Sequence, residues 1–161
     1  MNRIDYSKSH KWMQDRKYIN EFINLVKLKH SDYALDAGCG SGYVSAQIRP
    51  RVKGLLQIDH DWAMLSRDNI AKDTETLKAD LSDLWMLKDE TFDYIFSRSL
   101  FHRLKNPKKV YDEFFRLIKE NGKLVVSLSH APKKLMHEYK KIMSKKGYRL
   151  YLTDLQWERF F

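Results

Sequence analysis

The feature that most constrains the fold is a cluster of three glycines, Gly38, Gly40 and Gly42, directly after the short apolar run Tyr33–Ala37. Glycine suits a backbone that adopts positive φ or approaches a ligand closely, because a Cβ atom is penalised there. A short apolar run that stops at glycines is typical of a buried strand ending in a tight turn. The cluster therefore predicts that the first strand turns into the next helix at a ligand-binding loop.

Short apolar runs alternate with helix-period stretches along the chain, and this alternation predicts helices flanking a mostly parallel sheet. We expect four further strands, at Leu55–Ile58, Thr76–Ala79, Phe92–Phe96 and Lys123–Leu128. The first three are followed by Asp59, Asp80 and Ser97. Open parallel sheets bind ligands beyond the carboxyl ends of their strands, so these polar residues are candidates for a binding site.

Three expected helices have recognisable boundaries. The first spans roughly Trp12 to His30, because apolar residues recur there with helical spacing, and Lys27, Lys29 and His30 suit its negative end. The second begins with Asn106 as N-cap and Pro107 at the first position, and stops at Asn121–Gly122. The third opens at Pro132 and ends before Gly147.

The residues after Gly147 predict at least one more strand, because Tyr148, Leu150 and Leu152 alternate with Arg149, Tyr151 and Thr153. A partner within Leu155–Phe161 would complete a carboxyl-terminal antiparallel pair, which we expect to be short or incomplete. If only one strand forms, an apolar edge stays exposed and favours a homodimer or a partner protein.

Composition limits the number of domains, the partners and the cellular location that we expect for this chain. The chain has 161 residues and a formal charge of +9, which fits one domain with anionic metabolites or RNA among its partners. A single cysteine excludes an internal disulfide and the iron–sulfur cluster of a radical enzyme, and we expect no metal site. The chain lacks a membrane-length apolar run and a secretory h-region, so we expect a cytoplasmic protein without membrane partners.

The spacing of the glycines indicates whether the turn binds a dinucleotide or a ligand with an amino acid portion. A dinucleotide fingerprint, G-x-G-x-x-G, would need glycine where this chain has Tyr43. The observed G-x-G-x-G, with Asp36 two residues before it, suits a ligand whose amino acid portion lies against the turn. A carboxylate there favours a cationic ligand group and disfavours a diphosphate. A nicotinamide dehydrogenase is therefore the weakest alternative.

These residues resemble the class I S-adenosylmethionine-dependent methyltransferases, and more narrowly their type 11 domain. The first family motif corresponds to Asp36–Gly42, the acid after the second strand to Asp59, and the Met-Leu that follows it to Met64-Leu65. Further segments that are similar to family motifs are Ala79-Asp80-Leu81, Phe92–Ser97, Phe101–Pro107 and Gly122–Val126. The family's second histidine and its aspartate are replaced by Arg103 and Asn106, so roles tied to them do not transfer.

The resemblance implies a Rossmann-like, doubly wound α/β fold with helices on both faces of a mostly parallel sheet. It implies one methyltransferase domain over residues 1–161, with an amino-terminal helix and lid (1–31), a cofactor-binding core (32–130), and a last helix with terminal strands (131–161). It also implies S-adenosylmethionine as cofactor and S-adenosylhomocysteine as product. The residues expected to bind the cofactor are Asp36, Ala37, Gly38, Cys39, Gly40, Gly42, Asp59, His60, Met64, Asp80, Leu81 and Ser97.

Such an enzyme would transfer the methyl group to an oxygen, nitrogen or carbon nucleophile of a small-molecule acceptor, mainly by positioning it. His102 and Tyr6 are the candidate general bases, and Arg16 is a candidate partner for the cofactor carboxylate. Other interpretations stay open. Asp36 and Asp59 would serve equally as helix caps, and His102 and Arg16 as ordinary polar residues. The basic carboxyl-terminal half also fits an RNA methyltransferase, and the intact motif fits a non-catalytic cofactor-binding subunit.

Overall fold

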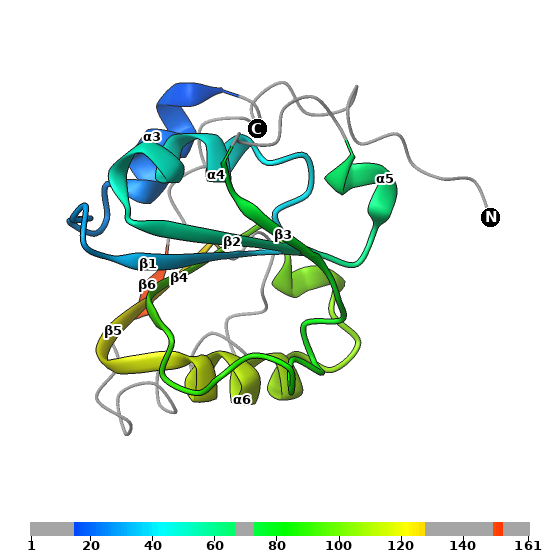
Figure 1. Cartoon of the computed structure of the whole chain (residues 1–161). Helices are drawn as coiled ribbons and strands as arrows, with labels where there is room; N and C mark the ends of the chain where they lie inside the picture. The colour runs from blue at the N-terminus through cyan, green and yellow to red at the C-terminus, as the bar shows by residue number, and fades with distance from the viewer. Residues whose placement is uncertain (1–14, 67–72, 128–149, 153–161) are drawn as a thin grey trace.

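The computed structural model describes residues 15–66, 73–127 and 150–152 (Figure 1). Within them, six strands form one sheet in the order β3-β2-β1-β4-β5-β6, and every neighbouring pair is parallel. The strands are β1 (Tyr33–Ala37), β2 (Gly54–Asp59), β3 (Glu75–Lys78), β4 (Phe92–Arg98), β5 (Ile118–Ser127) and β6 (Leu150–Leu152). The strand order reverses between β1 and β4, which is where such sheets bind their ligands.

Helices cover both faces of this sheet, as expected for a doubly wound α/β fold (Figure 1). Helices α3 (Arg16–Ile23) and α4 (Tyr43–Ile48) lie on one face, which we call the α3–α4 face, and α6 (Pro107–Leu117) lies on the other, the α6 face. Shorter helices are α5 (Trp62–Leu65), η1 (Arg49–Arg51) and η2 (Phe101–Arg103). None of the helices in the described part of the chain is long and apolar enough to cross a membrane.

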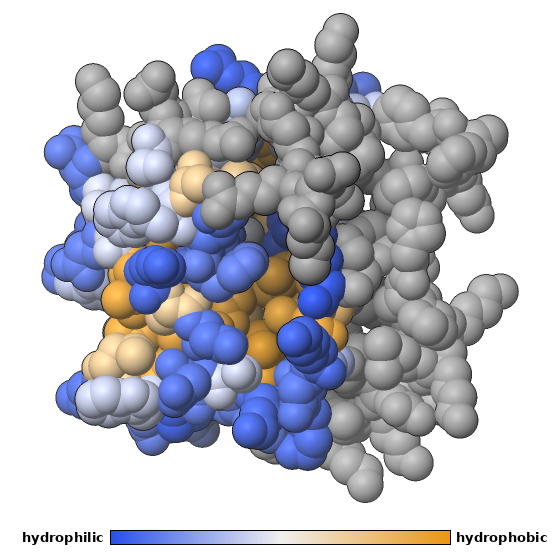
Figure 2. Space-filling view, turned by 90° about the vertical axis from the view of Figure 1, so that its right-hand side faces the viewer, coloured by the Kyte–Doolittle hydropathy of each residue, from blue (hydrophilic) through white to orange (hydrophobic). Residues whose placement is uncertain are grey.

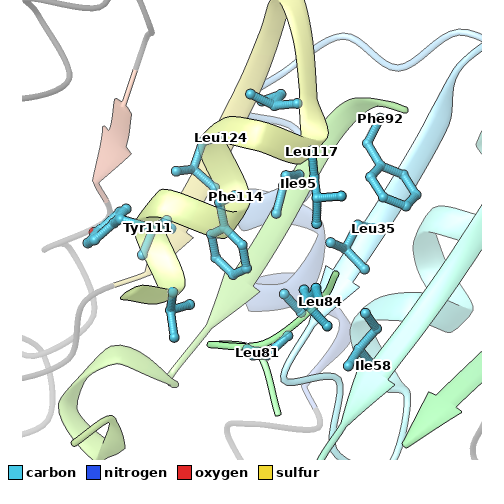
Figure 3. Close-up of a cluster of buried hydrophobic side chains, with 14 of the residues drawn as sticks. Leu35, Ile58, Leu81, Leu84, Phe92, Ile95, Tyr111, Phe114, Leu117 and Leu124 are labelled. Atoms are coloured by element: carbon cyan, nitrogen blue, oxygen red, sulfur yellow. The ribbon is translucent and has the colours of Figure 1, made fainter. Parts of the chain in front are cut away.

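Side-chain alternation along the strands builds the two cores. Ala34 on β1 packs with α3 and α4, whereas its neighbour Leu35 packs with α6. On β4, Tyr94 and Phe96 likewise share the α3–α4 face, and Ile95 points to the other side. Figure 3 shows the α6-face core, in which side chains from β1, β2 and β4 meet those of α6. The strands are therefore buried on both faces, which explains their almost continuous apolar runs.

Helix α6 starts where the sequence predicts but ends earlier. Asn106 is the N-cap, its side chain accepts from the Lys109 N–H, and Pro107 is the first helical residue. The predicted stop at Asn121–Gly122 is wrong, because the helix ends at Leu117 and Ile118 already pairs with Phe92 as the first residue of β5. The register between β4 and β5 then shifts before Tyr94 pairs with Lys123. Asn121 and Gly122, which the sequence suggested as a helix stop, therefore lie in an irregularity of β5.

Helix α3 is also shorter than the periodicity predicts. Asp15 caps it through the Lys17 N–H, and it ends at Ile23. Asn24 follows as C-cap, and its side chain accepts from the Arg51 guanidinium, which holds the chain as it leaves the helix. Val26 keeps its place in the core although it lies outside the helix. The basic residues from Lys27 onward therefore do not lie at the helix end, as the sequence had suggested.

The carboxyl-terminal strand differs in direction from the prediction. Leu150–Leu152 pairs with Leu124–Val126 in parallel, not antiparallel. Residues 128–149, which connect β5 to β6, are numerous enough for the crossover that a parallel pair requires. The predicted helix from Pro132, the second strand within Leu155–Phe161 and residues 1–14 of the predicted amino-terminal helix and lid lie outside the described residues.

Candidate functional site

The turn between β1 and α4 holds its three glycines in the left-handed region, with φ of +75° at Gly38, +56° at Gly40 and +79° at Gly42. The start of the turn is attached to β2, because the N–H groups of Gly38 and Cys39 both donate to the Ile58 carbonyl, at 2.8 and 3.0 Å. Gly42 then serves as the N-cap of α4. The predicted glycine-dependent turn at the end of the first strand is confirmed.

Two side chains border the backbone of this turn. A Cβ atom on Gly38 would lie 3.0 Å from the side chain of Leu100, and one on Gly40 would lie 3.4 Å from Cε of Met64. Leu100 follows β4 and Met64 belongs to α5, so the elements on both sides of β1 contribute to the border. A side chain at Gly38 would therefore crowd Leu100, and one at Gly40 would contact Met64, so both positions require glycine for their neighbours as well as for their backbone conformation.

Asp59, at the end of β2, is fixed by three neighbours. Its Oδ2 accepts from the Gly40 N–H at 2.8 Å and its Oδ1 from the Asp61 N–H at 3.0 Å. The Nδ1 atom of the exposed His60 lies 3.2 Å from Oδ1. The carboxylate thus joins the glycine turn to the start of α5 while it is still 8% exposed. Each carboxylate oxygen can accept a further hydrogen bond from a ligand.

A shallow groove adjoins Asp59 and is lined by His60, Asp61, Trp62, Ala63, Ser66 and Lys78. The Trp62 side chain is mostly exposed. Figure 2 views the molecule from the side of α5 and shows hydrophobic surface at the centre of the described residues, with hydrophilic residues around it. The groove itself is lined mainly by polar residues beside the exposed Trp62 ring, which suits a ligand with both an apolar ring and polar groups.

Asp36 is buried beneath the turn on the α3–α4 face, with 1% of its surface exposed. Its Oδ2 accepts from the Ser45 hydroxyl of α4 at 2.6 Å. Burial raises the pKa of Asp36 to about 7, although the Ser45 hydrogen bond and the charge of Arg98 act in the opposite direction. A carboxyl group of this kind carries a partial negative charge at neutral pH.

Arg98 is a further buried ionisable residue at this end of the sheet, and sequence reasoning did not select it. It ends β4 and is 9% exposed. Burial lowers its pKa to about 10, while the charges of Asp36 and Asp15 oppose that shift, so the guanidinium stays protonated at neutral pH. The signal in the sequence is an arginine two residues after Phe96, on the alternation that places Tyr94 and Phe96 in the α3–α4 core.

The predicted adenine-side residues divide into one exposed and one buried group. Asp80 is exposed, and its Oδ1 accepts from both the N–H and the hydroxyl of Ser82 at 2.8 Å, which lowers its pKa. Leu81 belongs to the α6-face core (Figure 3). The Ala79 N–H donates to the Asp59 carbonyl at 3.1 Å, so this segment lies beside the end of β2.

The end of β4 carries buried hydroxyl groups. Ser97 and Ser99 are 0% and 7% exposed, and neither Oγ atom has a hydrogen-bond partner in the structure as described. Ser99 adopts φ of +56°, which is uncommon for a residue with a side chain. Unpartnered buried hydroxyls are costly, and functional sites are among the places where they occur.

The remaining predicted residues have simpler surroundings. Ala37 is fully buried in the α6-face core. Cys39 is buried in the turn, and burial together with the charges of Asp36 and Asp59 raises the pKa of its thiol well above the usual range. It therefore acts as a small buried residue and not as a nucleophile. His102 lies on η2, but its side chain is outside the described part of the chain, as is the whole of Tyr6.

These features fit the cofactor that the resemblance implies. S-adenosylmethionine combines an amino acid end, a ribose with two hydroxyls and an adenine ring. The glycine turn presents a backbone without side chains in the left-handed region, and the Asp59 carboxylate at its border offers acceptors for two hydroxyls. Arg16, the sequence candidate for the cofactor carboxylate, is exposed on α3.

Comparison with known proteins gives the same assignment. The family model described as a methyltransferase domain matches residues 35–126. The phosphoethanolamine N-methyltransferase of Triticum aestivum is 25% identical over 141 residues, which are 83% of this chain and 28% of that protein. The chain thus spans little more than a quarter of that relative's length.

Solved structures share the fold. The YcgJ protein of Bacillus subtilis has a TM-score of 0.64 at 15% identity, covering 90% of this chain and 66% of that one. Phosphoethanolamine N-methyltransferase 1 of Haemonchus contortus, in complex with phosphoethanolamine and S-adenosylhomocysteine, has a TM-score of 0.60 at 12% identity, covering 68% and 24%. Because the family model covers more than half of the chain, this protein belongs to the methyltransferase domain family of class I S-adenosylmethionine-dependent methyltransferases.

Proposed function

We propose that this chain binds S-adenosylmethionine along the glycine turn and promotes methyl transfer to an oxygen, nitrogen or carbon nucleophile of a small-molecule acceptor. The observation that carries the proposal is the hydrogen bond from the Gly40 N–H to the Asp59 carboxylate. This hydrogen bond connects two parts of a binding site. One is a glycine turn whose backbone a ligand can approach closely, and the other is a carboxylate that can accept hydrogen bonds from two hydroxyls. A purely structural helix cap would not require the left-handed glycines beside it.

Each element of the site has a proposed partner in the cofactor. Asp59 accepts hydrogen bonds from the ribose hydroxyls. The amino acid end adjoins the backbone of the turn, which consists of Ala37, Gly38, Cys39, Gly40 and Gly42. Asp36 balances positive charge near the turn. The proposal is supported by the burial of Asp36 and by the side chains that border the turn.

The adenine ring is proposed to occupy the groove beside Asp59. Met64 and His60 border the ring, and the Oδ2 atom of Asp80 accepts from the adenine amino group. Leu81, which is buried behind Asp80, supports that segment from the core. Ser97 is proposed to face the cofactor from β4, because its buried hydroxyl lacks a partner among the described residues.

The cofactor supplies an electrophilic methyl group on a sulfonium sulfur. The chain contributes by holding the acceptor in line with that group, since alignment of two reactants accounts for most of the rate in reactions of this type. A general base is needed only if the acceptor atom carries a proton of high pKa. His102 on η2 and Tyr6 are the residues proposed for that role.

The acceptor is proposed to be a small molecule, and phosphoethanolamine is the first to screen because the curated relatives are named for it. RNA is the alternative acceptor. Most of the basic residues behind that alternative, from Lys133 to Arg149, lie outside the described residues, as does the edge proposed for a homodimer. Salt-dependent RNA retention and the molecular mass in solution test these two predictions.

Calorimetric titration with S-adenosylmethionine, S-adenosylhomocysteine and NADH tests the proposal. We expect micromolar binding of the first two ligands and none of NADH. Asp59→Ala should weaken binding by at least 100-fold, because it removes both hydroxyl acceptors and the partner of Gly40. Asp59→Asn keeps the size and one acceptor oxygen, so it should lose less.

Asp83→Ala is the matched control, since it removes an exposed carboxylate outside the site. It should bind like the wild type. Absence of binding to the wild-type protein, or equal losses in the Asp59 and Asp83 variants, would contradict the proposed function.

A further inference from the structure

The loops at the amino ends of β1 and β2 together form a surface of one sign of charge. Residues 24–32 connect α3 to β1, and residues 49–53 connect α4 to β2. The two loops are joined, because the N–H groups of Lys53 and Gly54 donate to the Asp32 carbonyl, at 2.8 and 3.4 Å. Their cations are Lys27, Lys29, Arg49, Arg51 and Lys53. We call these two loops the basic rim.

The single acid of the basic rim does not neutralise it. Asp32 is the only carboxylate in these two loops, so five cations and one carboxylate give a formal charge of +4. Asp32 is 9% exposed, and its Oδ2 accepts from the Lys29 N–H at 2.7 Å. Within the described part of the chain, no salt bridge involves a cation of the basic rim. The rim therefore attracts anions from solution.

Arg51 is held in position by neutral groups. Its guanidinium donates to the side-chain oxygen of Asn24 at 2.8 Å and to that of Asn20 at 2.9 Å. Amide oxygens carry no net charge, so they orient the guanidinium without cancelling its charge. Arg116 is different, because it pairs with two carboxylates. The planar donor fork of an oriented arginine matches the geometry of a phosphate group.

An open hollow and an aromatic ring lie beside these cations. The hollow has a volume of about 560 Å³ and is lined by residues 24–28, His30 and Arg51. At the start of β1, Tyr33 is 38% exposed, and the ammonium groups of Lys53 and Lys119 lie 5.2 and 5.7 Å from its ring centroid. Cations for the backbone and aromatic rings for the bases are combined in sites for single-stranded nucleic acid. An acidic peptide would use the cations but would not need the ring.

The basic rim lies at the end of the sheet opposite the proposed cofactor site. Strand β1 begins beside the rim and ends at the glycine turn, and its five residues span about 16 Å. Figure 1 shows the connection from α3 to β1 at one end of the sheet and α5 at the other. A partner bound at the rim therefore does not occupy the glycine turn.

We propose that the basic rim is a docking surface for single-stranded RNA. The phosphates contact the cations of the rim, and a base stacks on the Tyr33 ring. The RNA is held there as a partner and not as the methyl acceptor. This inference does not depend on cofactor binding, and its surface differs from the basic carboxyl-terminal half that fits an RNA methyltransferase.

Fluorescence anisotropy with a labelled single-stranded oligouridylate tests the proposal on the whole chain. The triple variant Lys27→Gln, Lys29→Gln, Lys53→Gln removes three exposed ammonium groups from the rim. It should bind at least about 10-fold more weakly than the wild type at low salt. Each lost phosphate contact reduces the slope of log K against log salt by about 0.7, so the slope should become shallower by about 2.

Two controls separate charge from position and from stacking. The triple variant Lys105→Gln, Lys108→Gln, Lys109→Gln removes the same charge from exposed positions at the start of α6 and should bind like the wild type. Tyr33→Leu removes the ring but no charge. It should bind at least about 5-fold more weakly with an unchanged salt slope, because a stacking contact is lost and no phosphate contact is. Unchanged thermal midpoints verify that the variants are folded.

The outcomes decide between RNA and other partners. The inference is overturned if the wild type does not bind the oligouridylate at low salt, or if Tyr33→Leu binds it unchanged. Equal losses in the two triple variants, or a loss confined to the α6 variant, would also overturn it. Poly-L-glutamate serves as the acidic protein probe. If it binds as tightly as the oligouridylate and depends on the same rim lysines, the rim fits an acidic protein and the assignment to RNA is wrong.

Discussion

The two faces of the sheet differ in what they bury. The α6 face is apolar apart from the hydroxyls of Ser97 and Tyr111. The α3–α4 face buries polar and ionisable groups among its apolar side chains, including Asp36, Ser45, Gln57 and Arg98. Burial of such groups costs free energy unless they are paired. We therefore expect the contacts on the α3–α4 face to contribute less to the stability of the fold than those on the α6 face. The comparison suggests that one face supplies stability and the other supplies charges to the ligand site.

The largest effect is expected on the α6 face. Phe114 is fully buried there and contacts the ring of Phe101 edge to face. Phe114→Ala should lower the free energy of unfolding by about 3–5 kcal/mol, because it creates a cavity in a close-packed core. Urea titration measures the change, and Phe115→Ala, at a half-buried position of the same helix, should cost less. A folded Phe114 variant with weakened cofactor binding would break the proposed division between the faces.

A second effect concerns the pH dependence set by the α3–α4 face. Between about pH 4 and pH 7, folded Asp36 keeps a proton that the unfolded chain releases, because its pKa is raised from 3.8 to about 7. The stability that this proton provides is therefore complete below pH 4 and is lost as the pH rises to about 7. The loss should be on the order of 4 kcal/mol, because one pKa unit corresponds to about 1.4 kcal/mol.

Denaturant unfolding at several pH values measures this contribution as the difference between wild type and Asp36→Asn, whose profile should be flatter. Ser45→Ala removes a hydrogen bond that favours the ionised form, so the decline should extend to higher pH. Identical profiles for wild type and Asp36→Asn would show that burial does not hold the proton on this carboxyl group.

The smallest effect is expected at the turn where the faces meet. Gly38→Ala places a side chain at φ +75° and 3.0 Å from Leu100. It should lower the free energy of unfolding by about 1–3 kcal/mol and weaken cofactor binding as well. Adding Leu100→Ala relieves the contact but not the backbone strain, so only part of the stability should return. Full recovery in the double variant would show that the contact alone is responsible.

Local patterns predicted much of this structure. The strand at Tyr33–Ala37, the turn after it and the N-cap at Asn106 depend on neighbouring residues, and all three are confirmed. The position of Asp59 followed from the parallel sheet, whose strand ends lie at one edge.

Features set by distant contacts were not predictable from the sequence. Helix α6 ends at Leu117 because Ile118 pairs with Phe92, a contact that helix periodicity does not contain. The direction of β6 likewise depends on the crossover before it. Arg98 was missed because a single cation after an apolar run resembles a surface residue. Its burial depends on which face of the sheet the alternating residues of β4 point to, and that face is set by the packing of the whole strand.

The bonds of Asp59 have a consequence for the entropy of ligand binding. Its carboxylate holds the Gly40 and Asp61 amides before any ligand is present, so the glycine turn and the start of α5 are ordered during folding. Their conformational freedom is then not lost again when a ligand arrives, and binding costs less. The amide proton of Gly40 should accordingly exchange slowly with solvent in the free protein, and the site is preorganised by one of its own ligand-binding groups.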